Sequence, residues 1–189
     1  LDGVTAPVTE LSFPMGRDRE ERQRHTATHA ERLAALLAAG KNCAFATIGD
    51  PSAYSTCGYL AAALRKLLPE VPIEIIPGVN SWSALAAAAG QVLAEDREEL
   101  RIVPGYIAPE TAALDRLLAG GEAVVLLKTY RSRNRLVEEL QQRRIPMVYG
   151  ANLGLPEQFV SSDPEAIKER PTEYLSLLLV PPHLREDHD

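Results

Sequence analysis

The chain has 189 residues, 46% of them hydrophobic, and this is enough to bury the core of one large or two small globular domains. Its net charge of -6 argues against a nucleic-acid surface, because proteins that bind phosphate backbones usually carry a basic face. No apolar run approaches the roughly 20 residues that cross a bilayer, and no signal-peptide pattern opens the sequence, so we expect a cytoplasmic protein without a membrane segment.

The first half of the chain alternates predicted strands and helices. Residues 9–13 are expected to form an edge strand, and residues 19–39 an amphipathic helix that covers a sheet and ends at Gly40. Apolar strands are predicted at residues 44–48 and 73–76, each followed by a helix, at residues 54–68 and 81–89. This alternation indicates a parallel sheet covered by helices. Cys43 and Cys57 fit reduced thiols better than a disulfide.

The second half differs in pattern, and the acidic stretch at residues 95–99 places a domain boundary near Arg97. We therefore expect an N-terminal domain over residues 1–97 and a C-terminal domain over residues 98–189. The predicted order in the second domain is strand 100–105, helix 111–119, strand 123–127 and helix 133–143. Three further segments are strand candidates or loop elements: residues 146–149, 158–160 and 174–180.

Two strand ends carry the residues of greatest functional interest. At Gly49-Asp50-Pro51, the Asp50 carboxylate could accept hydrogen bonds from a ligand, or it could organise its own turn as an Asx motif. At Pro77-Gly78, the glycine permits either the close approach of a ligand or a positive φ. Ligands bind at the ends of strands in open α/β sheets, and the two turns follow consecutive strands, which favours a shared pocket.

Other candidate residues are weaker. The basic segment Lys128, Arg131, Arg133 and Arg135 could meet ligand carboxylates or form a solvated surface. His25 and His29 share a helix face without a third metal ligand, so we predict a solvated face and no metal site. His183 and His188 are assigned no role. The sequence contains no dinucleotide fingerprint, no P-loop and no ordered triad for covalent catalysis.

Several motifs together resemble those of the tetrapyrrole methylases, a family that uses S-adenosylmethionine, and the resemblance extends over nearly the whole chain. Within this family the chain most resembles the enzymes that methylate C20 of precorrin-2 or cobalt-precorrin-2. Asn80 departs from the threonine or serine expected there, and Ile48 from leucine. The matching segments are Phe13-Pro14-Met15, residues 47–51 with Tyr54-Ser55-Thr56, residues 76–84, residues 126–131, residues 152–157 and residues 174–180.

The resemblance implies an α/β fold of two domains, with a parallel sheet in the first, a mixed sheet in the second and the active-site cleft between them. Members of the family begin with a strand and a loop of the form G-x-G-P-G-D-P, which this sequence lacks. We therefore expect the first strand and loop to be missing here and the natural protein to be longer. A homodimer is also expected by resemblance.

The resemblance further assigns residues to S-adenosylmethionine. Gly49, Asp50 and Tyr54 would contact its methionine and ribose parts, and Leu127 and Lys128 its adenine, mainly through backbone atoms. Lys128, Arg131 and Arg133 would anchor the carboxylates of the tetrapyrrole. The remaining residues expected in the cofactor pocket are Ser55, Thr56, Asn80, Ser81, Ala151, Ser176 and Leu177.

The implied activity is transfer of the sulfonium methyl group to an electron-rich carbon of the macrocycle. Holding donor and acceptor in line can supply most of the acceleration, which suits a site without an acid–base pair. Two alternatives stay open at this point. The chain could be another methylase of the family with a different substrate, or a non-catalytic binding or assembly protein with the same fold.

Overall fold

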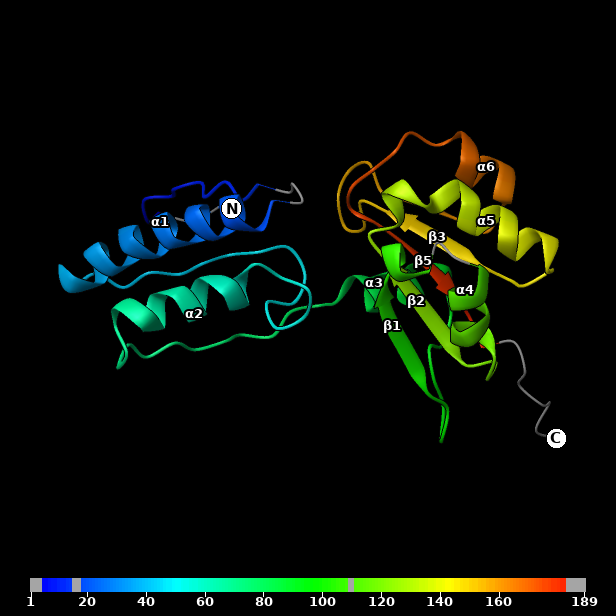
Figure 1. Cartoon of the computed structure of the whole chain (residues 1–189), viewed down its shortest axis with the longest axis horizontal. Helices are drawn as coiled ribbons and strands as arrows, with labels where there is room; N and C mark the ends of the chain where they lie inside the picture. Colours follow the sequence, from blue (N-terminus) through cyan, green and yellow to red (C-terminus); the bar gives the residue numbers. More distant parts are fainter. Residues whose placement is uncertain (1–4, 15–17, 109–110, 183–189) are drawn as a thin grey trace. The chain divides into compact units, whose positions relative to one another are not determined.

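The structure is a computed structural model, and it describes residues 5–14, 18–108 and 111–182. The chain divides into two compact units, unit 1 (Leu1–Gly78) and unit 2 (Val79–Asp189). Figure 1 shows the helices and strands of both units. This division falls after residue 78, earlier in the chain than the domain boundary expected after residue 97. The expected boundary stays a prediction.

Unit 1 begins with the long helix α1 (Arg19–Ala38), which confirms the helix predicted at residues 19–39. Its N-terminus is capped by Asp18, whose carboxylate accepts hydrogen bonds from the backbone N–H groups of Glu20 and Glu21 at 2.8 and 3.1 Å. At its C-terminal end, Gly40 adopts φ 75°, as expected of a glycine that ends a helix.

Helix α1 packs against helix α2 (Cys57–Leu67) and not against a sheet (Figure 1). The centre of the contact is Ala30 of α1 with Leu60 and Leu64 of α2, all buried. The side chains of Phe45 and Ile73 pack against the same cluster. The prediction that α1 covers a sheet is therefore wrong for the part of unit 1 that the structure describes.

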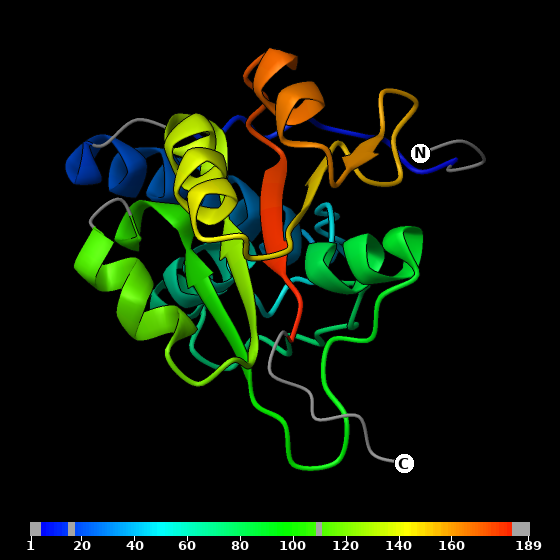
Figure 2. The same ribbon diagram turned by 90° about the vertical axis from the view of Figure 1, so that its right-hand side faces the viewer.

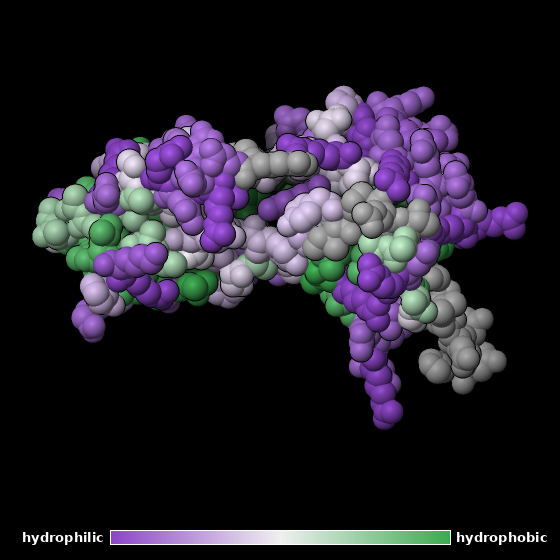
Figure 3. All heavy atoms as spheres, viewed as in Figure 1, coloured by the Kyte–Doolittle hydropathy of each residue, from purple (hydrophilic) through white to green (hydrophobic). Residues whose placement is uncertain are grey.

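The predicted strands of unit 1 are not formed. No strand is assigned within residues 5–14 or 18–78, so the expected edge strand and the expected parallel sheet are both absent from the described part of this unit. Ile48 and Ile76, the last residues of the two predicted apolar strands, are 69% and 74% exposed. Figure 3 shows apolar side chains on the surface of this unit. A strand needs a hydrogen-bonded neighbour, and an apolar pattern within one segment cannot supply it.

Unit 2 contains a five-stranded mixed sheet in the order β1-β2-β5-β3-β4, which agrees with the mixed sheet expected in the C-terminal half. Strands β1 and β2 pair in parallel, and the other pairs are antiparallel. The prediction of residues 123–127 as a strand is confirmed to the residue. The strands are β1 (Leu100–Pro104), β2 (Ala123–Leu127), β3 (Val148–Ala151), β4 (Phe159–Ser161) and β5 (Ser176–Val180).

Helices cover both faces of this sheet (Figure 2). Helix α3 lies on one face through the fully buried Leu85, which meets Val125 and Leu179. Three helices cover the other face and form the larger core around Leu126 and Leu178. The helices of unit 2 are α3 (Ser81–Ala89), α4 (Thr111–Leu118), α5 (Arg133–Gln142) and α6 (Pro164–Glu169), with short 3-10 turns η1 (Gly105–Ile107) and η2 (Thr129–Arg131).

The helices predicted from the sequence are confirmed within a few residues. Residues 81–89 match α3 at both ends, since Asn80 precedes the helix in extended conformation and Gly90 ends it with φ 64°. The helix expected at residues 54–68 starts three residues later, because Tyr54 adopts φ 55°, outside the helical region. Helix α6 was not predicted.

Candidate functional site

The Asp50 carboxylate is buried and makes three hydrogen bonds within unit 1. It accepts hydrogen bonds from the backbone N–H of Ser52 at 2.7 Å, from the Ser52 hydroxyl, and from the backbone N–H of Gly78 at 2.9 Å. The Ser52 hydroxyl is the main cause that holds the pKa of Asp50 below its ordinary value, and the two N–H donors add to it. Asp50 thus organises its turn, as one of the two sequence interpretations proposed, and its contact with a ligand stays a prediction.

The turns at Gly49 and Gly78 are in direct contact. A Cβ atom added to Gly78 would lie 2.4 Å from the carbonyl oxygen of Gly49 and 3.1 Å from its carbonyl carbon. Gly78 is therefore needed for the approach of the chain's own backbone, which neither of the two sequence interpretations included. Gly49 itself adopts φ 79°, a conformation that glycine enters without strain. The two turns form one rigid backbone junction, joined by Asp50.

The residues that follow the first turn lead into α2. Tyr54 is 51% exposed, and Ser55 and Thr56 are half-buried. The Ser55 hydroxyl accepts a hydrogen bond from the backbone N–H of Cys57 at 3.1 Å, whereas Thr56 stands at the helix start without a side-chain cap. Unit 1 thus brings together five predicted residues: Gly49, Asp50, Tyr54, Ser55 and Thr56.

Two more predicted residues lie at the start of α3, in unit 2. Asn80 is the residue before the first turn of this helix, and its side chain makes no capping hydrogen bond. Ser81 is exposed. The amide and hydroxyl groups therefore stand at the N-terminal end of a nine-residue helix, where polar and anionic groups are favoured.

The remaining predicted cofactor residues meet at one edge of the unit 2 sheet. Leu127 pairs with Leu177, and Ala151 pairs with Ser176. The carboxyl ends of β2 and β3 therefore lie beside the amino end of β5. Lys128 follows at φ 56° and ψ 46°, and its backbone N–H donates to the carbonyl of Ser176 at 2.9 Å.

Thr129 and Gly105 belong to the same edge but were missed as site residues. Thr129 is fully buried, and its hydroxyl lies 3.4 Å from that of Ser176. A Cβ atom on Gly105 would lie 3.0 Å from both the Leu127 carbonyl oxygen and a methyl carbon of Thr129. A hydroxyl residue two positions after a buried strand was the available sequence signal for Thr129. The close approach of Gly105 to Leu127 and Thr129 depends on the register between β1 and β2, which no local sequence pattern predicts.

The basic segment divides into residues with different surroundings. The Arg131 side chain is exposed, and its guanidinium lies 5.2 Å from the centre of the Tyr130 ring. Arg133 is buried, and it donates to the carbonyls of Pro171 and Lys168 at 3.0 and 3.3 Å and to Asn134 at 3.0 Å. The Arg133 guanidinium is thus already engaged within unit 2, and its role as a substrate ligand stays a prediction.

No cluster of three or more His, Cys, Asp or Glu residues that could hold a metal occurs within the described ranges. His29 donates a hydrogen bond to the Ser12 carbonyl at 2.8 Å and makes an edge contact with Phe13, while His25 is exposed. His183 and His188 lie outside the described residues. Cys43 and Cys57 are free thiols, the first exposed and the second part-buried.

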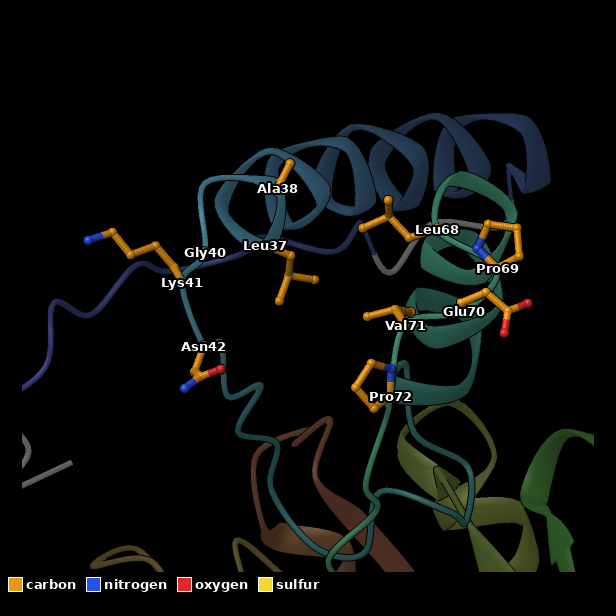
Figure 4. Close-up of a pocket in the computed structure, with 10 residues that line it drawn as sticks. All are labelled: Leu37, Ala38, Gly40, Lys41, Asn42, Leu68, Pro69, Glu70, Val71 and Pro72. Atoms are coloured by element: carbon orange, nitrogen blue, oxygen red, sulfur yellow. The ribbon is translucent and has the colours of Figure 1, made fainter.

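A pocket of about 530 Å³ lies in unit 1 near the C-terminal ends of α1 and α2 (Figure 4). None of its lining residues belongs to the predicted cofactor or substrate set, and most of them are apolar, so we assign no site to it. They are Leu37, Ala38, Gly40, Lys41, Asn42, Leu68, Pro69, Glu70, Val71 and Pro72. Among the helices that the structure describes, none is long and apolar enough to span a membrane.

Residues 2–166 match the family model of the Tetrapyrrole (Corrin/Porphyrin) Methylases. The chain is 33% identical to the cobalt-precorrin-2 C(20)-methyltransferase of Salmonella typhimurium, over 94% of this chain and 74% of that protein. It is also 33% identical to the precorrin-2 C(20)-methyltransferase of Sinorhizobium sp, over 80% of this chain and 60% of that protein. The chain thus spans only part of each of these relatives.

The chain is also similar in fold to solved structures of methyltransferases. The uroporphyrin-III-C-methyltransferase of Thermus thermophilus aligns with a TM-score of 0.59 and 27% identity, over 82% of this chain and 70% of that one. A cobalt precorrin-4 methyltransferase aligns with a TM-score of 0.65 over 88% of this chain and 72% of that one, at 18% identity. At that identity the second structure bears on the fold alone.

Proposed function

The chain belongs to the tetrapyrrole (corrin/porphyrin) methylases, and we propose that it is the S-adenosylmethionine-dependent C-methyltransferase of cobalamin biosynthesis that acts on C20 of precorrin-2 or cobalt-precorrin-2. The observation that carries this proposal is the similarity to two relatives named for that reaction, which extends over most of the chain. The fold and the sheet edge of unit 2 support it.

The chemistry of the predicted residues fits the cofactor. Bound S-adenosylmethionine supplies a methyl group on a sulfonium centre, together with an amino acid end and an adenine ring. The sheet edge at Leu127 and Leu177 presents backbone groups next to buried apolar side chains, which suits recognition of a flat heterocycle. Asn80 and Ser81 present an amide and a hydroxyl at the start of α3, which suit a polar or anionic end.

Asp50 has a positioning role in this proposal. Its carboxylate is engaged by Ser52 and Gly78, and its pKa is lowered by these donors, so it stays ionised and is a poor proton acceptor near neutral pH. We propose that Asp50 holds the backbone of Gly49 in place for the cofactor. The chain's contribution to catalysis is then the alignment of donor and acceptor, an effect that can be large without a general base.

Lys128 and Arg131 are the proposed anchors for substrate carboxylates. Lys128 directly follows β2, and Arg131 lies at the end of η2, where it is exposed and forms no ion pair within the described residues. An arginine suits a carboxylate because its planar group can donate two parallel hydrogen bonds.

Methyl transfer from labelled S-adenosylmethionine tests the function. The protein is incubated with precorrin-2 and, in parallel, with cobalt-precorrin-2, and the label is located by mass spectrometry. We expect label at C20 with at least one of them. Label on another macrocycle only would assign a different reaction of the family, and binding of the cofactor without transfer to any tetrapyrrole would favour the non-catalytic alternative.

The proposal includes two further expectations, a homodimer and a cytoplasmic location. Light scattering after gel filtration measures the first, and fractionation of cells that produce the natural protein measures the second. A monomer at micromolar concentration, or recovery outside the cytoplasm, would contradict the respective expectation.

A further inference from the structure

Three side chains of unit 2 form a continuous contact beside the sheet edge. The Arg131 guanidinium lies over the Tyr130 ring at 5.2 Å, and the ring centres of Tyr130 and Tyr174 lie 5.3 Å apart at an angle of 50°. Tyr130 and Arg131 belong to η2, whereas Tyr174 precedes β5. One cation and two aromatic rings are thus in contact, although Tyr130 and Tyr174 are 44 positions apart in the sequence. We call these three residues the Arg131–Tyr130–Tyr174 cluster.

The cluster has an accessible surface. Tyr174 is 37% exposed and its neighbour Leu175 is 41% exposed. Tyr130 is half-buried between its two partners, and Arg131 is exposed. An aromatic ring, an apolar side chain and a cation are therefore all accessible to solvent in and beside this cluster.

The segment that carries Tyr174 is held in place by polar contacts. The Glu173 carboxylate accepts hydrogen bonds from the Asn152 side chain at 2.9 Å and from Arg170 at 3.2 Å. The carbonyl of Tyr174 accepts a hydrogen bond from the backbone N–H of Ser176 at 2.9 Å. The backbone on both sides of Tyr174 is thus fixed before any ligand binds, which lowers the entropic cost of binding.

Two basic residues lie in or next to the cluster in the sequence, although the protein as a whole is acidic. Lys128 and Arg131 lie within four positions of each other, and the acidic residue nearest in sequence, Glu173, is paired with Arg170. Burial and the neighbouring Tyr130 raise the pKa of Tyr174, so its ring is a neutral phenol at physiological pH. A cation beside a neutral aromatic surface suits a ligand that is flat, conjugated and carries carboxylates.

We propose that the Arg131–Tyr130–Tyr174 cluster is the surface that contacts the tetrapyrrole ring, which rests on the function proposed above. Tyr174 contacts a pyrrole-derived ring of the macrocycle, and Arg131 binds a carboxylate on its periphery. Tyr130 is the positioning residue between them, because it touches both and holds the guanidinium over its own face. The cluster determines which tetrapyrroles bind, and it leaves the binding of S-adenosylmethionine unaffected.

The test measures binding and turnover separately. Binding of sirohydrochlorin, a stable oxidised form of precorrin-2, is measured by equilibrium dialysis, and binding of S-adenosylmethionine by calorimetry. The variants are Tyr174→Leu and Tyr130→Leu, with Tyr174→Phe and Tyr130→Phe as conservative changes. Tyr59→Leu is the matched control, because Tyr59 is 73% exposed on α2 and lies outside every proposed contact.

We expect each leucine variant to weaken sirohydrochlorin binding about three- to tenfold, the range that a lost ring contact gives. KM for precorrin-2 should rise by a similar factor with kcat little changed. The phenylalanine variants and Tyr59→Leu should bind as the wild type does. All variants should keep the wild-type affinity for S-adenosylmethionine.

Unchanged sirohydrochlorin binding in Tyr174→Leu would overturn the proposal, as would a loss of S-adenosylmethionine affinity in place of tetrapyrrole affinity. If Tyr130→Leu fails to fold, Tyr174→Leu decides alone, because Tyr174 is only part-buried. Failure of the proposed function gives a different result: the wild type would bind sirohydrochlorin through the cluster and transfer no methyl group to precorrin-2.

Discussion

Replacement of Gly78 by alanine tests whether the two turns of unit 1 form one junction. The added Cβ would lie 2.4 Å from the Gly49 carbonyl oxygen, and ordinary contacts begin near 3.4 Å, so the two backbones must separate. Both partners are backbone, and neither can rotate away as a side chain would. The separation also lengthens the 2.9 Å hydrogen bond from the Gly78 N–H to Asp50.

The expected cost is about 1–3 kcal/mol, the range for overpacking a well-packed contact, and the weakened hydrogen bond adds to it. This is a large share of the roughly 5–15 kcal/mol by which a typical protein is stable. Urea unfolding followed by far-UV circular dichroism measures it, because α1 and α2 make unit 1 strongly helical. Amide hydrogen exchange at position 78 gives a local readout, and the variant should exchange faster.

Gly58→Ala is the matched control. Gly58 lies within α2, and a Cβ atom added there would meet nothing within 4 Å. Alanine is the better helix former by about 0.5–1 kcal/mol, so this variant should be as stable as the wild type or slightly more so. Equal stability of Gly78→Ala and the wild type, with the amide still protected, would refute the contact between the turns.

Two further predictions concern charged residues. Asp50→Asn should destabilise the protein at neutral pH. Because the pKa of Asp50 is lowered in the folded state, the difference in the free energy of unfolding between variant and wild type should shrink as pH falls below about 4. If urea titrations gave a difference that is constant with pH, this prediction would be contradicted. Arg133→Ala should lower the free energy of unfolding by about 1–3 kcal/mol, because it removes a buried side chain and leaves the carbonyls of Lys168 and Pro171 without its hydrogen bonds. Arg131→Ala should change it by less than about 0.5 kcal/mol while weakening substrate binding, and the reverse order of these two arginines in thermal unfolding would count against their assignment.

Local sequence patterns predicted most helices and strands of unit 2, and short motifs predicted the protein family. The alanine-rich run of α3 and the continuous apolar run of β2 were sufficient signals here, because both segments find packing partners within unit 2. The motifs around Asp50, Gly78 and Lys128 indicated the tetrapyrrole methylase fold, which the comparisons confirm. They also brought Leu127, Ser176 and Leu177 into one predicted site, and the sheet register places these residues together.

Only the tertiary structure decided which contacts the candidate residues already make within the chain. The sequence left Asp50 and Arg133 open as ligand-binding charges, and the structure adds that Gly78 and Ser52 donate to the first and that the second donates to carbonyls of and just after α6. Strand-like segments of unit 1 remain unpaired, because pairing requires a neighbour from elsewhere in the chain. The sequence by itself determined which glycine, polar and charged residues follow the apolar segments of the chain. Only the folded chain decided which polar groups are already satisfied, because a buried charge binds the nearest donor or acceptor, whatever its distance along the sequence.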